Sequence, residues 1–361
     1  MFFRLESDSH AAGDGASGLT VSFNRAYLLI LALNLISFVV PIGAVVFIVL
    51  LFFLKVPARN TPVMAGLKVI DWTGSLLIIG GTLMILLGLD FGDVIFPWSS
   101  ATTISLIVFG AVTTGIFLLN EWKFTKNPII PLRLFSTTSM VASYSVYACN
   151  SYVFIGLAYY LPLYSQAVLG ASALSSGLHL LPLVVSTSLA AALAGVLIQQ
   201  TGKYLQVMYV AQVFLTLGVG LFIDLRFEKN LVKLFVFESL AGIGIGMNIE
   251  APILAAQAAT TVRDTAAVTA TMNFVRSLVT AVSVVVGGII LQNVMNAENP
   301  GLINLLGQQL ASSFNGNEAL ANVELIRTLP KNQQVVVRQA YFRSLKLVWI
   351  MVCISFVLIH V

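Results

Sequence analysis

The chain has 361 residues, of which 58% are hydrophobic and only 9% are charged, and its formal net charge is +4 at pH 7. Ordinary soluble domains carry about 25% charged residues, and a soluble fold of this length needs a polar surface that this composition does not supply. The composition therefore excludes a soluble globular domain and indicates an integral membrane protein. The small positive charge does not indicate nucleic-acid binding, because basic loop residues that set membrane topology explain it better.

Residues that carry enzyme or metal chemistry are sparse. Cys149 and Cys353 both lie in apolar runs and suggest neither a disulfide framework nor a metal cluster. His10, His179 and His360 lack H-E-x-x-H or similar spacing, and the sequence shows no nucleophile–base pair and no phosphate-binding glycine loop. We therefore expect no cofactor and no metal, and a membrane-bound enzyme is the least favoured class of function.

The membrane spans follow from the apolar runs. Residues 1–25 are polar and lack the apolar core of a signal peptide, so we expect a disordered tail there. A spanning helix needs about 20 mainly apolar residues, and Pro41 is the expected kink point of the first, long span. On this basis the sequence predicts nine spans: Ala26–Leu54, Thr73–Asp90, Ala101–Asn120, Met140–Tyr164, Leu174–Gln199, Leu205–Leu225, Leu231–Gln257, Ala266–Gln292 and Arg343–Val361.

Lys and Arg in the short loops predict the orientation. The basic loops carry Lys55, Arg59, Lys68, Lys123, Lys126, Arg133, Lys203 and Arg263. We expect these loops to face the cytoplasm, although Arg226 and Lys229 on the opposite side break the pattern. The long connection 293–342 then lies on the non-cytoplasmic face. Its segments LINLLGQQLASSF and QQVVVRQAYFRSLKLVW have helix-like apolar spacing and predict short interfacial helices, with a floppy loop as the alternative.

The segment GIGIGMNIEAPILAAQ departs most from an ordinary spanning helix. It combines small, polar and helix-breaking residues: Gly242, Gly244, Gly246, Asn248, Glu250 and Pro252. A broken helix at membrane depth is tolerated where it lines a water-filled cavity or is buried in protein. Two interpretations stay open. The segment forms the wall of a substrate pathway with Glu250 hydrated or paired, or the glycines form a tight contact between helices and Glu250 lies near the cytoplasmic surface.

Few ionisable residues lie inside the predicted spans, since each costs about 2.5–3.5 kcal/mol at the bilayer centre. The candidates are Glu238, Glu250 and Arg276, whereas the span-end residues Asp90, Asp224 and Lys233 are expected to be interfacial anchors. Arg276 and Asn273 are three residues apart and share a helix face. We expect that face to turn inward, and an Arg276–Glu250 ion pair is one arrangement that it allows.

One predicted span, Met140–Tyr164, is unusually polar for its position. It contains Asn150 and several tyrosines, among which we select Tyr147 and Tyr160. Tyrosine rings combine apolar faces with a hydrogen-bonding tip, so they suit flat amphipathic molecules. Helix packing is the alternative role for these side chains.

The segment LAGVLIQQTGKYLQVM resembles the G-x-L-a-D-r-x-G-r signature loop of the major facilitator superfamily. Gly195, Leu197, Gly202 and Lys203 match that pattern, whereas Gln199 stands where the acid usually lies. Longer phrases are similar to the fungal fourteen-spanner drug:proton antiporters, a family of multidrug and toxin efflux pumps: DWTGSLLIIGGTLMILLGLDFG, NEWKFTKNPIIPLRLF, YYLPLYSQAVLGASALSSGLHLLP and FVRSLVTAVSVVVGGIILQNVM.

The resemblance implies a domain organisation behind the polar tail. Residues 26–54 correspond to the last helix of an N-terminal bundle, residues 55–139 to two extra linker helices with basic cytoplasmic loops, and residues 140–361 to the C-terminal six-helix bundle, which includes the loop 293–342. About the first five helices of the family are missing. The expected fold class is therefore an all-α integral membrane protein with one transporter bundle, two linker helices and one leftover helix.

The resemblance also implies a function, proton-coupled efflux of small amphipathic organic compounds across a lipid bilayer. The expected location is the plasma membrane, with the vacuolar membrane as the alternative. Alternating access needs two bundles around a midplane site, so we expect no transport by this chain alone unless a partner chain supplies the other half. The competing hypothesis is a truncated relic or a regulatory partner of a full-length exporter.

Overall fold

The computed structural model describes residues 70–358 except 93–94, 126–127, 131 and 262–263, together with the isolated helical positions 43–45, 47–49, 52 and 64. The chain divides into two compact units, Met1–Gly66 and Leu67–Val361. Apart from those isolated positions, the predicted tail and the predicted first span with its kink lie outside the described residues. The description below concerns the second unit.

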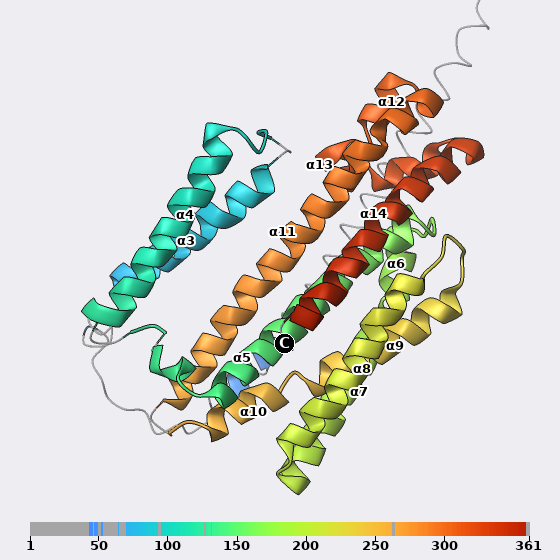
Figure 1. Cartoon of the computed structure of the whole chain (residues 1–361). Helices are drawn as coiled ribbons and strands as arrows, with labels where there is room; N and C mark the ends of the chain where they lie inside the picture. The colour runs from blue at the N-terminus through green and yellow to red at the C-terminus, as the bar shows by residue number, and fades with distance from the viewer. Residues whose placement is uncertain are drawn as a thin grey trace, which may run out of the picture. The chain divides into compact units, whose positions relative to one another are not determined.

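The second unit is built from helices joined by short turns (Figure 1). They are α3 (Trp72–Phe91), α4 (Ala101–Leu119), α5 (Thr138–Ala167), α6 (Ala173–His179), α7 (Leu181–Thr201), α8 (Tyr204–Leu221), α9 (Leu231–Met247), α10 (Ala251–Ala258), α11 (Thr265–Leu306), α12 (Gln308–Ser312), α13 (Gly316–Ala321) and α14 (Lys331–Leu358). Short single turns named η1 (Asn120–Phe124), η2 (Leu132–Phe135), η3 (Phe222–Asp224) and η4 (Val323–Thr328) complete the order.

Within the described residues, seven helical segments are long and apolar enough to cross a membrane. They are Trp72–Phe91, Ala101–Phe124, Thr138–Ala167, Ala173–Thr201, Tyr204–Asp224, Leu231–Ala258 and Thr265–Leu306. These seven coincide with the second to eighth predicted spans, which are confirmed as helices. Residues 343–358 of the predicted ninth span form the second part of α14, and residues 359–361 lie outside the described residues.

The connection 293–342 differs from the prediction. Helix α11 continues through Pro300 and ends only at Gly307, which adopts a φ of 83°. QQVVVRQAYFRSLKLVW is the first part of α14 and not a separate interfacial helix, because it contains no glycine or proline that would stop the final helix. Only α12, α13 and η4 remain as short helices between α11 and α14.

Side-chain caps explain where several helices begin. Asp71 accepts a hydrogen bond from Gly74 N at the start of α3, Ser100 accepts one from Thr103 N at α4, and Asn230 accepts one from Lys233 N at α9. Such caps satisfy backbone N–H groups that have no partner inside the helix. The ends of α3 and α4 are also tied together, because Asn120 Nδ2 and Thr125 Oγ1 donate to Asp71 Oδ2 at 3.2 and 3.1 Å.

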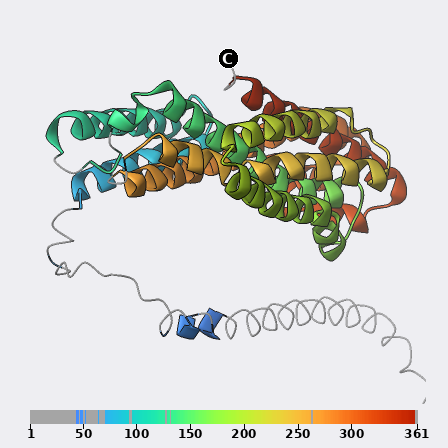
Figure 2. The ribbon, with the colours of Figure 1, turned by 90° about the horizontal axis from the view of Figure 1, so that it is seen from below.

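Three sets of helices pack most closely. The most extensive contacts join α7 with α9, α8 with α9, α5 with α11 and α3 with α4, and Figure 2 shows α7, α8 and α9 side by side. A large apolar core runs between the helices of the bundle, with Tyr160, Phe222 and Trp349 among its fully buried side chains.

The outward surface is apolar. Leu76 on α3, Phe109 on α4, Leu189 on α7 and Leu217 on α8 are all more than half exposed. A surface of this kind is unfavourable in water but suits the hydrocarbon of a bilayer. The chain is therefore an integral membrane protein.

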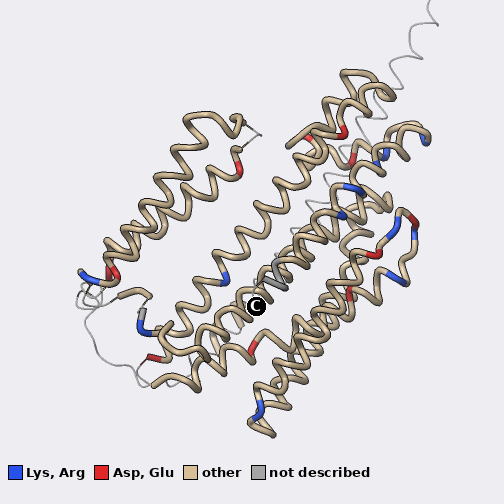
Figure 3. Tube along the Cα trace, viewed as in Figure 1, with Lys and Arg blue, Asp and Glu red and all other residues tan. Residues whose placement is uncertain are grey.

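Charged side chains gather toward the ends of the helices (Figure 3). Three ion pairs are present in the described part of the chain. Arg133 pairs with Asp264 at 2.5 Å, Lys233 with Asp224 at 2.5 Å, and Arg343 with Glu298 at 3.0 Å. Asp224 and Lys233, both expected as interfacial anchors, thus contact each other.

Candidate functional site at a helix break

The chain leaves helical geometry at Asn248–Glu250, between α9 and α10. Pro252 lies in the first turn of α10, where its missing N–H costs nothing because the first backbone donors of a helix have no partner inside it. The proline therefore favours a new helix start here, and α9 ends a few residues earlier. The break divides the predicted span Leu231–Gln257 into two helices.

Asn150 of α5 holds the end of α9. Its Nδ2 donates to the carbonyl oxygens of Ile245 and Asn248, at 3.2 and 3.3 Å. The last carbonyls of a helix lack partners in the following turn. Here the Asn150 side chain supplements the Asn248 N–H, which also donates to the Ile245 carbonyl at 3.1 Å. The sequence pointed to Asn150 and Asn248 separately, but it gave no signal for their contact.

The two asparagines leave polar atoms unpaired. Asn248 is 0% exposed and Asn150 is 4% exposed. Among the described residues, Asn150 Oδ1 and both side-chain polar atoms of Asn248 are buried without a hydrogen-bond partner. A buried polar group without a partner costs about 1–3 kcal/mol. Two acceptors and one donor are therefore available to water or to a polar group of a ligand.

The surroundings of this amide pair are apolar and aromatic. Tyr147, one turn before Asn150 on α5, is 3% exposed and belongs to a cluster with Ala256 of α10 and Met272 of α11. Ala251, at the start of α10, packs with α7 and α8 residues in a second apolar cluster. Apolar walls with a few well-placed polar groups are typical of small-molecule sites.

The glycines before the break serve close helix packing. A Cβ on Gly242 would lie 2.7 Å from the Leu183 carbonyl oxygen of α7, and one on Gly246 would clash with the Thr187 carbonyl oxygen. A Cβ on Gly244 would lie 2.6 Å from Leu215 Cα of α8. The backbone of α9 is thus wedged between α7 and α8, as in the helix-contact interpretation of this segment.

Three polar residues singled out in the sequence are exposed. Glu250 lies exposed at the break, and Asn273 and Arg276 are exposed on α11. The inward orientation expected for Asn273 and Arg276 is not found among the described residues: both are exposed, although Met272 and Ser283, four residues before and seven residues after Arg276, are buried. No ion pair joins Arg276 to Glu250 in the part of the chain that the structure covers.

Tyr160 has a packing role in this structure. It is 0% exposed, and its Oη donates to the carbonyl oxygen of Val284 at 2.5 Å. A Cβ on Gly287 of α11 would collide with the Tyr160 ring. The absence of a side chain at Gly287 therefore gives Tyr160 its space between α5 and α11.

The signature-like loop is a tight turn between α7 and α8. Gly202 adopts a φ of 67°, and its N–H donates to the Ile198 carbonyl oxygen, so it ends α7 in a left-handed conformation. Gln199 and Lys203 are exposed, and Leu197 is 47% exposed. A Cβ on Gly195 would meet nothing within 4 Å.

A buried acid, Glu238, is one of the three ionisable candidates inside the predicted spans, but the sequence assigned it no place in the pathway. It is on α9 and only 1% exposed, and its Oε2 has no hydrogen-bond partner among the described residues. The signal available in the sequence was a carboxyl group inside a predicted span.

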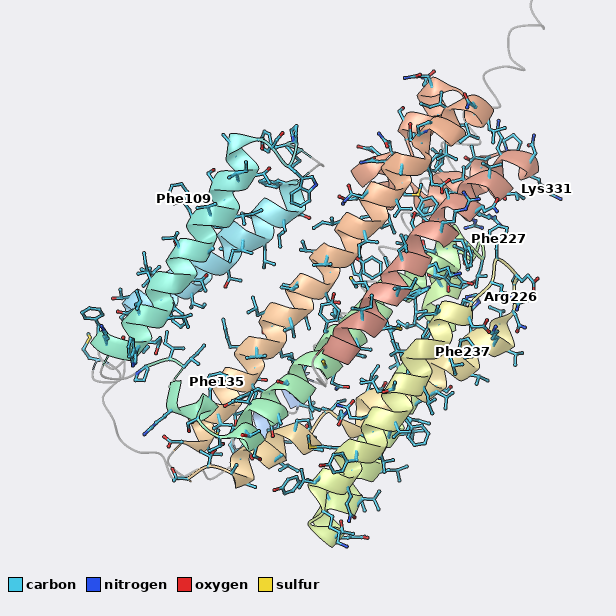
Figure 4. All side chains as sticks on the ribbon, viewed as in Figure 1. Phe109, Phe135, Arg226, Phe227, Phe237 and Lys331 are labelled. Carbon is cyan, nitrogen blue, oxygen red and sulfur yellow. The ribbon has the colours of Figure 1, made fainter. Side chains whose placement is uncertain are left out.

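Two small surface hollows lie around residues 225–230 and contain none of the predicted site residues. One has a volume of about 150 Å³ and is lined by Arg226, Glu228 and Lys233, among others. The other, of about 220 Å³, includes Phe227 and Arg338. Arg226 and Phe227, one lining residue of each hollow, are labelled in Figure 4.

The chain is similar to named fungal transporters. It is 42% identical over 313 residues to the MFS-type transporter ppz2 of Metarhizium majus, covering 86% of this chain and 54% of that protein. It is 44% identical over 314 residues to the efflux pump dotC of Dothistroma septosporum, covering 86% of this chain and 53% of the pump. The chain thus spans about half the length of these relatives. No protein-family model matches it.

The similarity to a solved structure is weaker than the sequence similarity to the fungal proteins. A bacterial homologue of the human lysosomal transporter Spinster, solved in an inward-facing and occupied conformation, matches 82% of this chain with a TM-score of 0.45 and 18% identity. The match covers 62% of that protein. It adds nothing to the similarity with the fungal relatives.

Proposed function

We propose that this chain supplies the C-terminal bundle of a major facilitator superfamily exporter, which moves small amphipathic organic compounds out of the cytoplasm in exchange for protons. The similarity to fungal transporters and efflux pumps over 86% of the chain supports the class. The observation that carries the proposal is the buried amide pair Asn150–Asn248 at a break in a membrane-spanning helix.

The amide pair suits a ligand with one polar group and an apolar body. Asn150 Nδ2 is engaged by α9 carbonyls, so its Oδ1 and the Asn248 amide remain for the ligand. The neighbouring apolar clusters provide the rest of the contact surface. Such a site accepts many compounds because apolar surface imposes little geometry.

The exposed polar face of α11 supports a second bundle that packs over it. Arg276 lies about 15 Å along α11 from its predicted membrane end, at 1.5 Å per residue, and it is exposed in this chain. A charged side chain at that depth normally faces a cavity or a partner. We propose that the half of the relatives which this chain does not match covers Asn273 and Arg276, and that the two halves move around the site between them.

A chimaera tests this function. The stretch of this chain that matches the efflux pump dotC replaces the corresponding half of that pump, and the product is expressed in a drug-hypersensitive yeast. We expect protection against small amphipathic toxins by the chimaera and none by the 361-residue chain alone. A chimaera that reaches the plasma membrane without giving protection to any toxin that dotC exports would contradict the proposal and favour a relic or a regulatory partner.

A further inference from the structure

Glu238 is a buried acid in an apolar setting. It lies two turns into α9, next to Phe237, which Figure 4 labels. Leu234, Ala241 and Ile245 lie four residues before it and three and seven residues after it, so all three share its helix face. Each of them is at most 1% exposed and belongs to the main apolar core. The carboxyl group therefore points into the interior of the bundle and not toward lipid.

None of the ion pairs among the described residues includes this carboxyl. Among the described residues, Lys233 is the only cation on α9, and its Nζ already pairs with Asp224 Oδ2. Helices α7 and α10 contain no titratable side chain, and α8 contains only Tyr204 and Tyr209. Helix α5 contributes six tyrosines and Cys149, and His179 at the end of α6 contacts Phe235.

A carboxyl in such a place is accommodated in its neutral form. An unpaired carboxylate in an apolar interior loses its hydration without compensation, whereas the protonated carboxyl is uncharged. Glu238 Oε2 has no donor to stabilise a negative charge within the described part of the chain. The geometry favours a carboxyl that holds a proton as long as the surrounding helices stay closed.

We propose that Glu238 is a proton-binding site, protonated in the conformation described here and deprotonated when the packing around α9 opens to water. Proton release converts the carboxyl to a carboxylate and passes the proton to that water. The role of the site in transport rests on the proposed exporter function, but its protonation does not.

The position of Glu238 links it to the amide pair. Ile245, whose carbonyl accepts from Asn150, is seven residues farther along the same face of α9, about 10 Å at 1.5 Å per residue. Between them, Gly242 keeps the backbone of α9 against α7. A shift of α9 relative to α7 that opens the amide pair to a ligand would therefore also admit water toward Glu238. Proton release from Glu238 and ligand binding at the amide pair would then be coupled through α9.

Infrared spectroscopy of the purified full chain in lipid nanodiscs tests the proposal. At neutral pH we expect the carbonyl band of a protonated carboxyl in the wild type. Glu238→Gln should remove that band, whereas Glu250→Gln, which changes an exposed acid on the same span, should leave it unchanged. Absence of the band in the wild type, or an unchanged band in Glu238→Gln, would overturn the proposal.

A second variant covers the case in which Glu238→Gln does not fold. Glu238→Asp keeps the carboxyl in a slightly different place, so we expect the band to persist at a shifted frequency. A band that stays at the wild-type frequency comes from another acid and overturns the proposal. Because the readout needs no transport, a chimaera that fails to export would leave the band in place, and export with no band would refute the Glu238 site alone.

Discussion

Asn150 on α5 donates its side-chain N–H to the carbonyl oxygen of Ile245, 3.2 Å away at the end of α9. This contact joins residues 95 positions apart and fixes the place where a membrane-spanning helix stops. The same side chain reaches the Asn248 carbonyl at 3.3 Å. The break in α9 is therefore a structure shared by two helices and not a local defect of one sequence segment.

Replacing either asparagine should affect stability differently. Asn150→Leu removes the side-chain donor to the Asn248 carbonyl and leaves the Ile245 carbonyl with only the backbone N–H of Asn248 at 3.1 Å, so we expect a loss of about 1–3 kcal/mol in the free energy of unfolding. Asn248→Leu removes a side chain whose polar atoms have no partner, so we expect little loss. Thermal unfolding of the two purified variants measures both effects. Equal destabilisation by the two substitutions would contradict the assignment of Asn150 as the residue that holds the break.

The glycine positions allow a matched comparison. Gly246→Ala places a Cβ against the Thr187 carbonyl oxygen and 3.0 Å from Ala190 Cβ of α7, and overpacking of this kind typically costs about 1–3 kcal/mol. Gly195→Ala on α7 meets open space and should be neutral or stabilising by up to about 1 kcal/mol, since alanine is the better helix former. Denaturation midpoints of the two variants measure both changes in stability. An unchanged midpoint for Gly246→Ala would show that α7 and α9 are not in this close contact.

The effect on stability of substituting Gly202, in the turn between α7 and α8, should come from backbone conformation alone. Gly202 has a φ of 67° and nothing near its Cβ position, so Gly202→Ala should cost about 1–2 kcal/mol through the left-handed conformation. Gly202→Asn should cost less, because asparagine visits that region more easily. If both variants unfold at the wild-type temperature, the turn has a different conformation from the one described.

In the proposed two-bundle exporter, the exposed face of α11 should line a water-filled path. In the dotC chimaera with Cys149 and Cys353 replaced, Arg276→Cys should react with a membrane-impermeant thiol reagent applied to opened vesicles. Leu189→Cys, 61% exposed on the apolar surface of α7, should remain unmodified because lipid covers it. Labelling at residue 189 with none at residue 276 would place α11 against lipid and contradict the proposed covering half.

The sequence was sufficient to predict the spanning helices because each is a long apolar run that can satisfy its backbone only as a helix. It also predicted that the helix is interrupted near Pro252 and Asn248, since glycine and proline act on the local backbone. The sequence predicted a separate interfacial helix over QQVVVRQAYFRSLKLVW, whereas this segment is continuous with the final helix, because no glycine or proline interrupts α14.

The contacts of the site could not be predicted from the sequence. The pairing of Asn150 with α9 depends on how α5 lies against that helix, and no local pattern encodes this. The burial of Glu238 and the exposure of Glu250 likewise depend on which face of α9 meets the core. Both residues are acids within one predicted span, so the sequence treats them alike.

Dye efflux from cells that express the chimaera tests the proposed site most directly. Cells are loaded with a small amphipathic dye, and its loss is followed for the chimaera, for Asn248→Leu and for the exposed control Gln206→Leu. Removal of one buried hydrogen-bonding group, worth about 1–3 kcal/mol, should slow efflux by Asn248→Leu roughly 10- to 100-fold at equal surface expression, whereas Gln206→Leu should match the parent. Efflux at the parental rate by Asn248→Leu would show that the amide pair at the helix break takes no part in transport.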